Sequence, residues 1–280
     1  MSASLTKELS ASKETMPEKS PEAKQAAREA GGTSILSGVT KGRRKKPIFA
    51  LLYGTDGIGK TTFCSKAPSP LFIGGERGDD QLDVARLPNA RTVGEFLTQI
   101  KAIGDEKHEF NTIALDSIDW LELLIWKQAC AEAKVTSIED YGGGFQKGYI
   151  RASEIWRGIL LELQELAQRF HVLLIGHALV KSFQDPEEAI AYDRYILKVH
   201  EKSASLIREI VDIVLFAKFE VEVLKEKGSR KARGIGDGSR VMYTQERPAF
   251  IAKNRYNLPL EMPLEWQPFA NAIKEFYEQK

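Results

Sequence analysis

One stretch of eight residues constrains the fold of this chain more than any other. It reads Gly-Thr-Asp-Gly-Ile-Gly-Lys-Thr, from Gly54 to Thr61, and it follows the apolar run 48–53. In this G-x-x-x-x-G-K-[ST] pattern a buried strand turns through glycines into a helix. The glycines let backbone N–H groups converge on one anion, and the N-terminus of the helix adds partial positive charge. The stretch therefore predicts a phosphate-binding loop.

Each polar position of this loop has an expected role. The Lys60 ammonium is placed to reach the β- and γ-phosphates of a nucleotide, and the Thr61 hydroxyl is placed to hold Mg²⁺. The expected nucleotide-binding residues are Gly54, Thr55, Asp56, Gly57, Ile58, Gly59, Lys60, Thr61 and Thr62.

The composition of the 280-residue chain excludes several classes of protein. The net charge is +1, so any nucleic-acid binding must use local basic patches. Two cysteines, Cys64 and Cys130, give no disulfide framework, and the four histidines have no zinc-ligand spacing. The sequence lacks both an apolar run of membrane-spanning length and the apolar centre of an N-terminal secretory signal. We therefore expect a cytoplasmic protein that does not use a membrane.

The chain is expected to consist of a tail and a folded core. Residues 1–46 are polar and lack apolar periodicity, which predicts a disordered tail. The tail ends in the basic run 41–46, which is either a solvated linker or a contact to a phosphate backbone. Residues 47–280 are expected to form the core.

Strands alternate with helices through most of the core, which predicts an α/β fold with a mainly parallel sheet flanked by helices. Antiparallel strands at 240–245 and 249–253 are expected to extend the sheet, and an amphipathic helix is expected at 266–277. Two segments, 137–148 and 178–202, are expected to be mobile loops. The expected strands are 47–53, 70–73, 111–115, 171–176 and 211–224, and the main helices are 92–103, 119–134 and 149–170.

Polar residues follow four of these strands, and the carboxyl ends of parallel strands meet at one edge of a sheet. Asp116 follows the third strand in the Walker B pattern, as a carboxylate that holds Mg²⁺. Glu76 follows the second and is a candidate to orient or deprotonate a water. His177 follows the fourth and is a candidate sensor of the γ-phosphate. Their alternative roles are a helix N-cap for Asp116, an ordinary surface residue for Glu76 and a hydrogen-bonded strand end for His177.

In the order and spacing of these motifs, residues 47–264 resemble the RecA-like recombinase core. They are especially similar to the phage Sak-type single-strand annealing ATPases, a group of phage nucleotide-binding AAA-type proteins. The resemblance implies a RecA-like P-loop fold that binds ATP and Mg²⁺ and hydrolyses ATP with Glu76. His177 stands where recombinases often have Gln. The matching motifs are Walker A at 54–61, the strand with the catalytic glutamate at 72–76, Walker B at 115–117 and the nucleotide-coupling strand at 174–177.

The resemblance also implies partners. Residues 251–255 match a late strand whose basic residues reach the nucleotide of a neighbouring subunit, so Lys253 and Arg255 would act in trans in a ring or filament. The two expected loops lie where the family binds single-stranded DNA, although acidic residues in the second weaken that assignment. A single-strand-binding protein of phage or host is a further expected partner. The candidate DNA contacts are Phe145, Lys147, Tyr149, Lys181, Arg194, Lys198 and Lys202.

The resemblance thus predicts an ATP-dependent, single-stranded-DNA-binding recombination protein that anneals or pairs strands, with DNA-stimulated ATPase activity. It would work in the host cytoplasm if phage-encoded. Two alternatives stay open: a nucleotide-dependent clamp or loader that acts on protein partners, and a P-loop kinase of small molecules. For a kinase lid, Arg233 and Arg240 are poor candidates on sequence alone.

Overall fold

The computed structural model describes residues 35–76, 80–187, 189–220, 222–225, 232–235 and 238–279. The chain divides into two units, 1–44 and 45–280. In the first unit the described part holds one short 3₁₀ helix, η1 (Ile35–Gly38), and an Arg44 side chain that donates to Thr40 Oγ1 at 2.8 Å. The greater part of the tail predicted at 1–46 lies outside the described residues.

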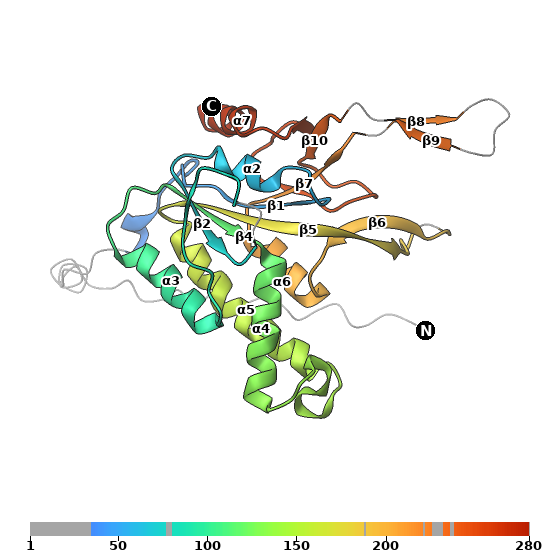
Figure 1. Cartoon of the computed structure of the whole chain (residues 1–280). Helices are drawn as coiled ribbons and strands as arrows, with labels where there is room; N and C mark the ends of the chain where they lie inside the picture. Colours follow the sequence, from blue (N-terminus) through green and yellow to red (C-terminus); the bar gives the residue numbers. More distant parts are fainter. Residues whose placement is uncertain are drawn as a thin grey trace, which may run out of the picture. The chain divides into compact units, whose positions relative to one another are not determined.

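A mainly parallel sheet forms the centre of the second unit (Figure 1). Its described strands run in the order β12-β10-β7-β1-β5-β4-β2-β3, with β11 paired to β7 and β6 paired to β5. All pairs from β3 to β7 along this order are parallel, and β10, β11 and β12 add antiparallel strands beyond β7. The expected fold class is therefore confirmed. The parallel strands are β1 (Phe49–Gly54), β2 (Pro70–Gly74), β3 (Ala85–Arg86), β4 (Thr112–Asp116), β5 (His171–Phe183) and β7 (Ile213–Phe219).

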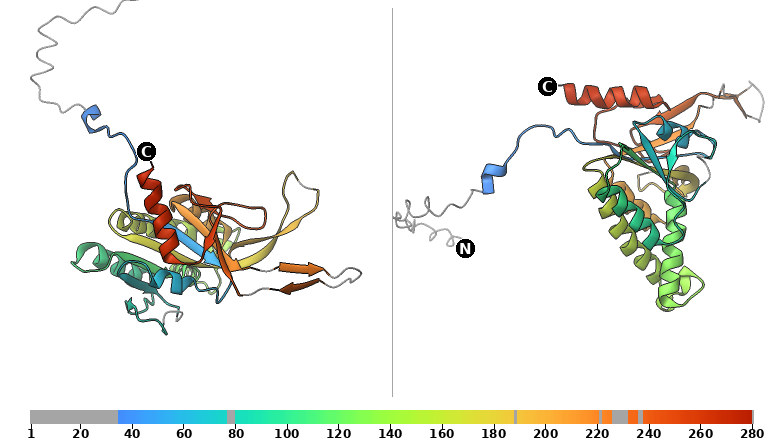
Figure 2. Two further views of the ribbon diagram at one scale, coloured as in Figure 1. Left: turned by 90° about the horizontal axis from the view of Figure 1, so that it is seen from above. Right: turned by 60° about the vertical axis from the view of Figure 1, so that its left-hand side comes forward.

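Helices cover both faces of this sheet, as Figures 1 and 2 show. The alternation of β1 assigns its residues to the two faces, because successive side chains of a strand point in opposite directions. Leu51 and Tyr53 pack in the core under α3 (Val93–Asp105), α4 (Ile118–Ala133), α5 (Lys147–Leu166) and α6 (Glu201–Ile210). Ala50 and Leu52 pack in the opposite core with α2 (Lys60–Ser65) and α7 (Trp266–Glu278). Both faces of β1 are thus buried, which explains its uninterrupted apolar sequence.

Most predicted helices occur at the expected positions. The helix expected at 92–103 begins after an N-cap at Thr92, whose Oγ1 accepts from Glu95 N at 3.1 Å. The C-terminal amphipathic helix is also confirmed as α7. Among the described residues, none of the helices combines the length and apolar character needed to cross a membrane.

The prediction of an irregular second loop at 178–202 is wrong for most of its length. The strand β5 continues to Phe183, and β6 (Tyr192–Leu197) pairs with it antiparallel, placing Lys181 opposite Arg194. The helix α6 then begins at Glu201. The charged residues that suggested a loop occupy a hairpin that extends beyond the covered sheet, where polar side chains reach water. Glu188, one of the acidic residues considered there, lies outside the described residues.

Two further expectations need correction. The first expected loop, 137–148, contains the 3₁₀ turn η2 (Ile138–Gly143), anchored by the buried Ile138, and α5 begins at Lys147. The antiparallel strands expected at 240–245 and 249–253 are not paired with each other in the described sheet, and a bridge between Arg247 and Phe250 lies at the turn between them. Residues 240–243 pair with β7 instead, and Lys253 does so near the amino end of that strand. The remaining strands are β8 (Glu222–Lys225), β9 (Ala232–Ile235), β10 (Arg240–Tyr243), β11 (Lys253–Asn254) and β12 (Glu261–Pro263).

Candidate active site at the carboxyl edge of the sheet

The glycine-rich loop leaves the carboxyl end of β1 and leads into α2. Gly54 pairs with His177 on one side and with Ala217 on the other, and a Cβ at Gly54 would lie 2.0 Å from the Ala217 carbonyl oxygen. Gly59 has φ +101° and directly precedes α2, so it adopts a backbone conformation that L side chains rarely take. The glycines at these positions are therefore required by the close approach of β7 and by the turn into the helix.

The Lys60 side chain is buried inside this loop. Its ammonium donates to the carbonyl oxygens of Gly54 and Thr55 at 3.2 and 3.0 Å. Burial lowers the pKa of Lys60, against the opposing influence of the nearby Asp56 and Asp116 carboxylates. A positive charge is thus held within the loop by weak carbonyl acceptors, a position that a phosphate oxygen would stabilise.

Thr61 and Asp116 meet as the Walker motifs predict. Thr61 Oγ1 donates to Asp116 Oδ2 at 2.8 Å, and Asp116 is buried at the end of β4. A hydroxyl and a carboxylate oxygen are the hard donors that Mg²⁺ prefers, so this pair fits the expected ion. The N-cap of α4 is Ser117, whose Oγ accepts from Trp120 N at 3.4 Å. The alternative role of Asp116 as the helix cap is therefore wrong.

Hydrogen bonds hold Glu76 at the carboxyl end of the neighbouring strand β4. Its backbone N donates to the Asp116 carbonyl oxygen at 3.3 Å, as does the N–H of Gly75. The Ser117 hydroxyl donates to Glu76 Oε1. Glu76 Oε2 lies 3.9 Å from His177 Nε2. The carboxyl ends of β2 and β5 therefore bring Glu76 and His177 together, as the sequence predicted.

His177 is oriented by a carboxylate that the sequence analysis did not assign to the site. Asp119 Oδ2 accepts from the His177 backbone N at 3.0 Å and lies 3.2 Å from His177 Nδ1. This hydrogen bond raises the pKa of His177, and burial opposes it. Asp119 was considered only as the start of a helix. Its position three residues after Asp116 was the available signal, since the first helical turn returns to the same edge of the sheet.

The two residues expected to act in trans lie at the opposite edge of the sheet. Lys253 pairs with Val214 near the amino end of β7, whereas the loop adjoins its carboxyl end. The Lys253 ammonium donates to the carbonyl oxygens of residues 208, 209 and 211 at 2.7, 3.0 and 2.6 Å, where α6 ends. Arg255 Nη1 donates to Asp212 Oδ1 at 3.0 Å. Neither residue reaches the phosphate loop of its own chain.

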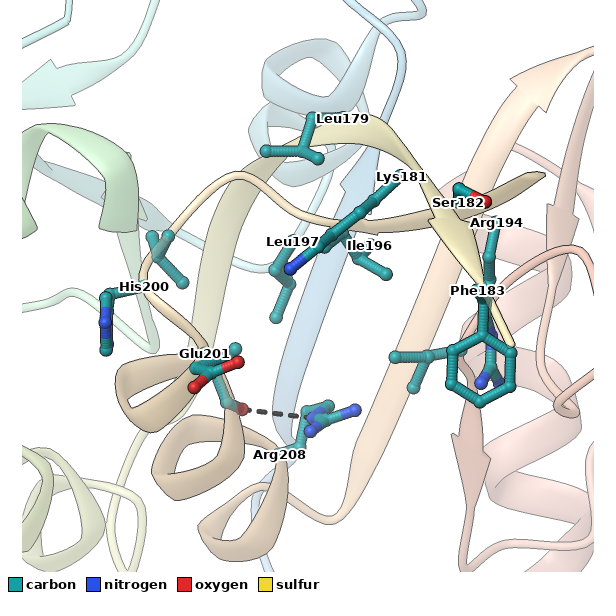
Figure 3. Close-up of a pocket in the computed structure, with 13 residues that line it drawn as sticks. Leu179, Lys181, Ser182, Phe183, Arg194, Ile196, Leu197, His200, Glu201 and Arg208 are labelled. Atoms are coloured by element: carbon teal, nitrogen blue, oxygen red, sulfur yellow. Dashed lines mark hydrogen bonds between the residues drawn. The ribbon is translucent and has the colours of Figure 1, made fainter. Parts of the chain in front are cut away.

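The candidate DNA contacts fall into two groups that adjoin at α6. Lys181 and Lys198 are exposed on or beside the hairpin, whereas the Arg194 side chain is only 12% exposed and pairs with Glu246. Together with Phe183, Lys181 and Arg194 line a cavity of about 530 Å³ between the hairpin and α6 (Figure 3). Arg194 also lies over the Phe183 ring, 4.9 Å from its centroid.

The second group lies at the start of α5. Phe145 is 89% exposed, and Lys147 Nζ donates to the Gly142 carbonyl oxygen at 3.0 Å. The Tyr149 ring stacks on His200 with a centroid distance of 4.1 Å, so one of its faces is already covered. Lys202 lies in the first turn of α6, two residues beyond that stack.

Comparison with known proteins gives one family. Residues 46–256 match the family described as AAA domain. No curated protein matches the chain at a significant level. The chain is similar to the crystal structure of the RadB recombinase, with 13% identity and a TM-score of 0.31 over 75% of this chain and 91% of that one. It is also similar to the flagellar accessory protein FlaH from Methanocaldococcus jannaschii, with 11% identity and a TM-score of 0.29 over 74% and 90%. At these sequence identities and TM-scores, the similarity does not indicate a function for this chain.

Proposed function

Since the chain belongs to the AAA domain family, we propose that it binds ATP with Mg²⁺ at residues 54–62 and hydrolyses it. The observation that carries this proposal is the meeting of four strand ends at one edge of the sheet. There, the loop ammonium of Lys60, the Thr61–Asp116 pair and the Glu76–His177 pair surround the position where a γ-phosphate would lie. This is the set of groups that phosphoryl transfer to water needs.

In this proposal each side chain has a distinct task. Lys60 stabilises negative charge on the β- and γ-phosphates, and Thr61 with Asp116 would hold Mg²⁺, which neutralises charge on the same oxygens. Glu76 accepts the proton of the attacking water, and the hydroxyl of Ser117 fixes the orientation of its carboxylate. His177 contacts the γ-phosphate, in a ring orientation that Asp119 sets.

We further propose that the ATPase works on single-stranded DNA, in annealing or strand pairing of the phage Sak type. Lys181 and Lys198 support this proposal, because both are exposed basic residues on the segment that follows His177. Phe145 supports it as an exposed aromatic side chain able to stack on a base. Arg194 and Tyr149 contribute less, since an ion pair and a ring stack already occupy them. A single-strand-binding protein remains a proposed additional partner.

The proposed assembly is a ring or filament of identical subunits. Lys253 and Arg255 lie far from their own phosphate loop, so they can serve only a neighbouring subunit's site, after leaving their present partners. Arg255→Ala is the cleaner variant for this test, because Asp212 keeps an ion pair with Lys46 at 2.8 Å. Mixing Arg255→Ala subunits with Glu76→Gln subunits should restore part of the ATPase activity. Mixed oligomers without any recovery would refute sharing of the site.

The ATPase rate with and without single-stranded DNA tests the proposed function, with mass photometry to follow assembly. We expect turnover that DNA stimulates and that is accompanied by strand annealing; a single-strand-binding protein added to the same reaction tests that partner. ATPase activity with neither DNA binding nor annealing would refute the recombination role and favour a clamp or loader of protein partners. Phosphoryl transfer to a nucleoside instead of water would favour a small-molecule kinase.

A further inference from the structure

Arg240 lies against the phosphate loop from the side opposite the proposed hydrolytic groups. A Cβ on Gly59 would lie only 2.6 Å from Arg240 Nη1 and 3.7 Å from its Cζ. Gly59 therefore does more than permit the turn into α2: its missing side chain leaves the space that the guanidinium fills. The sequence had suggested only that Arg240 was a poor candidate for a kinase lid.

The sheet register explains why this arginine reaches the loop. Ala217 of β7 pairs with Gly54 on one side and with Met242 of β10 on the other. Arg240 precedes Met242 by two residues on an antiparallel strand, so it extends about 6–7 Å beyond the edge at which the loop begins. Met242 is buried in the core that includes α2, and period-2 alternation puts Arg240 on the same face.

The charge of Arg240 is uncompensated in the described part of the chain. No described carboxylate lies within ion-pair distance of its guanidinium, whereas Arg247, further along the chain, pairs with Glu261. A guanidinium stays charged at all relevant pH values and presents a planar set of donors that matches phosphate oxygens. An exposed, unpaired guanidinium touching a phosphate-binding loop is thus positioned for an anionic ligand of that loop.

We propose that Arg240 is a nucleotide-contacting residue of the same chain that binds the α- or β-phosphate, so that it recognises ATP and ADP alike. The assignment rests on the proposed function. The strand order supports the choice of phosphates: Glu76, Asp116 and His177 follow β2, β4 and β5 on one side of β1, whereas Arg240 begins β10 on the other. With the γ-phosphate directed to the first side, the guanidinium faces the portion that ATP and ADP share.

Equilibrium binding of fluorescent ADP and of a non-hydrolysable ATP analogue tests the assignment. We expect Arg240→Ala to weaken both ligands by about tenfold or more, as loss of a hydrogen bond to a charged group does. Arg240→Lys, which keeps the charge but not the fork of donors, should fall between Arg240→Ala and wild type. Arg247→Ala is the matched control, since this exposed arginine lies further along the chain and pairs with Glu261. It should bind both nucleotides as wild type does.

The outcomes separate this assignment from the proposed function. Unchanged binding of both nucleotides by folded Arg240→Ala would overturn the assignment alone. A normal ADP affinity with a selective loss of ATP turnover would also overturn it, because that pattern belongs to a group acting on the γ-phosphate. A wild-type protein that binds neither nucleotide would overturn the proposed function and the assignment with it. Circular dichroism and the thermal midpoint of each variant establish that it is folded.

Discussion

Asp119 accepts two contacts from His177 with a single carboxylate oxygen, one from its backbone N at 3.0 Å and one from its ring Nδ1 at 3.2 Å. The first contact holds the β5 backbone at His177, just after the buried part of the strand, and the second orients the imidazole of the same residue. This arrangement leaves Nε2 directed towards Glu76 Oε2, 3.9 Å away. A carboxylate behind an imidazole sets both its orientation and its protonation.

Replacing Asp119 with Asn should lower the pKa of His177, because the charged hydrogen-bond acceptor that favours the imidazolium is lost. The chain has four histidines, so the ring protons can be followed individually by NMR titration. His171 is an internal control: its Nδ1 accepts from Ile48 N at 2.8 Å, remote from Asp119. An unchanged titration of His177 in the variant would refute the role assigned to Asp119.

The raised pKa of His177 also predicts that the stability of the wild-type protein depends on pH. A raised pKa in the folded state means that His177 adds stability below its unfolded pKa, and that this stability is lost as pH rises through the folded value. Urea denaturation across this pH interval should show a free energy of unfolding that decreases as pH rises in the wild type. The decrease should be smaller in Asp119→Asn. Equal slopes in the two proteins would contradict the linkage.

Glu76→Gln should keep nucleotide affinity and lose turnover by on the order of 10²–10⁴-fold, because the amide cannot take a proton from water. The amide can still accept the Ser117 hydroxyl hydrogen bond, so the local structure should persist. Turnover is measured by phosphate release, and affinity by equilibrium titration of a nucleotide analogue. Wild-type turnover in this variant would exclude Glu76 as the base.

Lys60→Ala, unlike Glu76→Gln, should reduce nucleotide affinity, by roughly tenfold to a hundredfold, through the loss of charged contacts to phosphate. The protein itself should remain folded, since the Lys60 ammonium donates only to two loop carbonyl oxygens. The same titration as for Glu76→Gln provides the measurement. Undiminished affinity in Lys60→Ala would mean that the loop does not bind phosphate as proposed.

Glu122 predicts a separate effect of pH on stability. It is a buried carboxylate on α4 whose Oε2 accepts from His200 N at 2.8 Å, and burial raises its pKa. Because the folded pKa is raised, the folded state is favoured at low pH, and stability falls as pH rises from the unfolded value through the folded one. Glu122→Gln removes the charge at nearly constant volume. It should flatten this part of the pH profile of unfolding, and an unaltered profile would contradict the prediction.

Lys253→Met should lower the free energy of unfolding by roughly 1–3 kcal/mol, because three carbonyl oxygens where α6 ends lose a charged donor. Lys274→Met is a suitable control, since this lysine is 72% exposed and forms only a surface pair with Glu278. Its loss should cost under about 1 kcal/mol. Urea denaturation compares the two variants, and equal stabilities would show that Lys253 does not cap the helix.

The sequence was sufficient to predict the parallel sheet, the loop and the strand ends, because local signals encode each of them. Glycine spacing, buried apolar runs and one polar residue after each run locate Lys60, Asp116 and Glu76 without knowledge of long-range contacts. Asp119 and Arg240 were missed for the opposite reason. Each belongs to the site through its element's packing, Asp119 through the first turn of α4 and Arg240 through the register of β10 on β7.

The hairpin shows a different limit of sequence reasoning. The segment 178–202 looks like a loop because charged residues are scattered along it, yet β6 supplies the backbone hydrogen bonds of its first six residues. Backbone pairing depends on which partner strand is available, and the residue types of one segment do not specify it. The same holds at the end of 249–253, where Lys253 pairs with β7.

The unbroken course of β5 from the buried sheet into the hairpin has a thermodynamic consequence. Because this segment is already ordered, a ligand that binds the hairpin has no ordering entropy of about 1–2 kcal/mol per residue to overcome there. Under the proposed function, coupling between the hairpin and the nucleotide site would use a shift in the position of an ordered strand. Such coupling is reciprocal: by whatever factor bound nucleotide changes affinity at the hairpin, a ligand at the hairpin changes the affinity for nucleotide by the same factor.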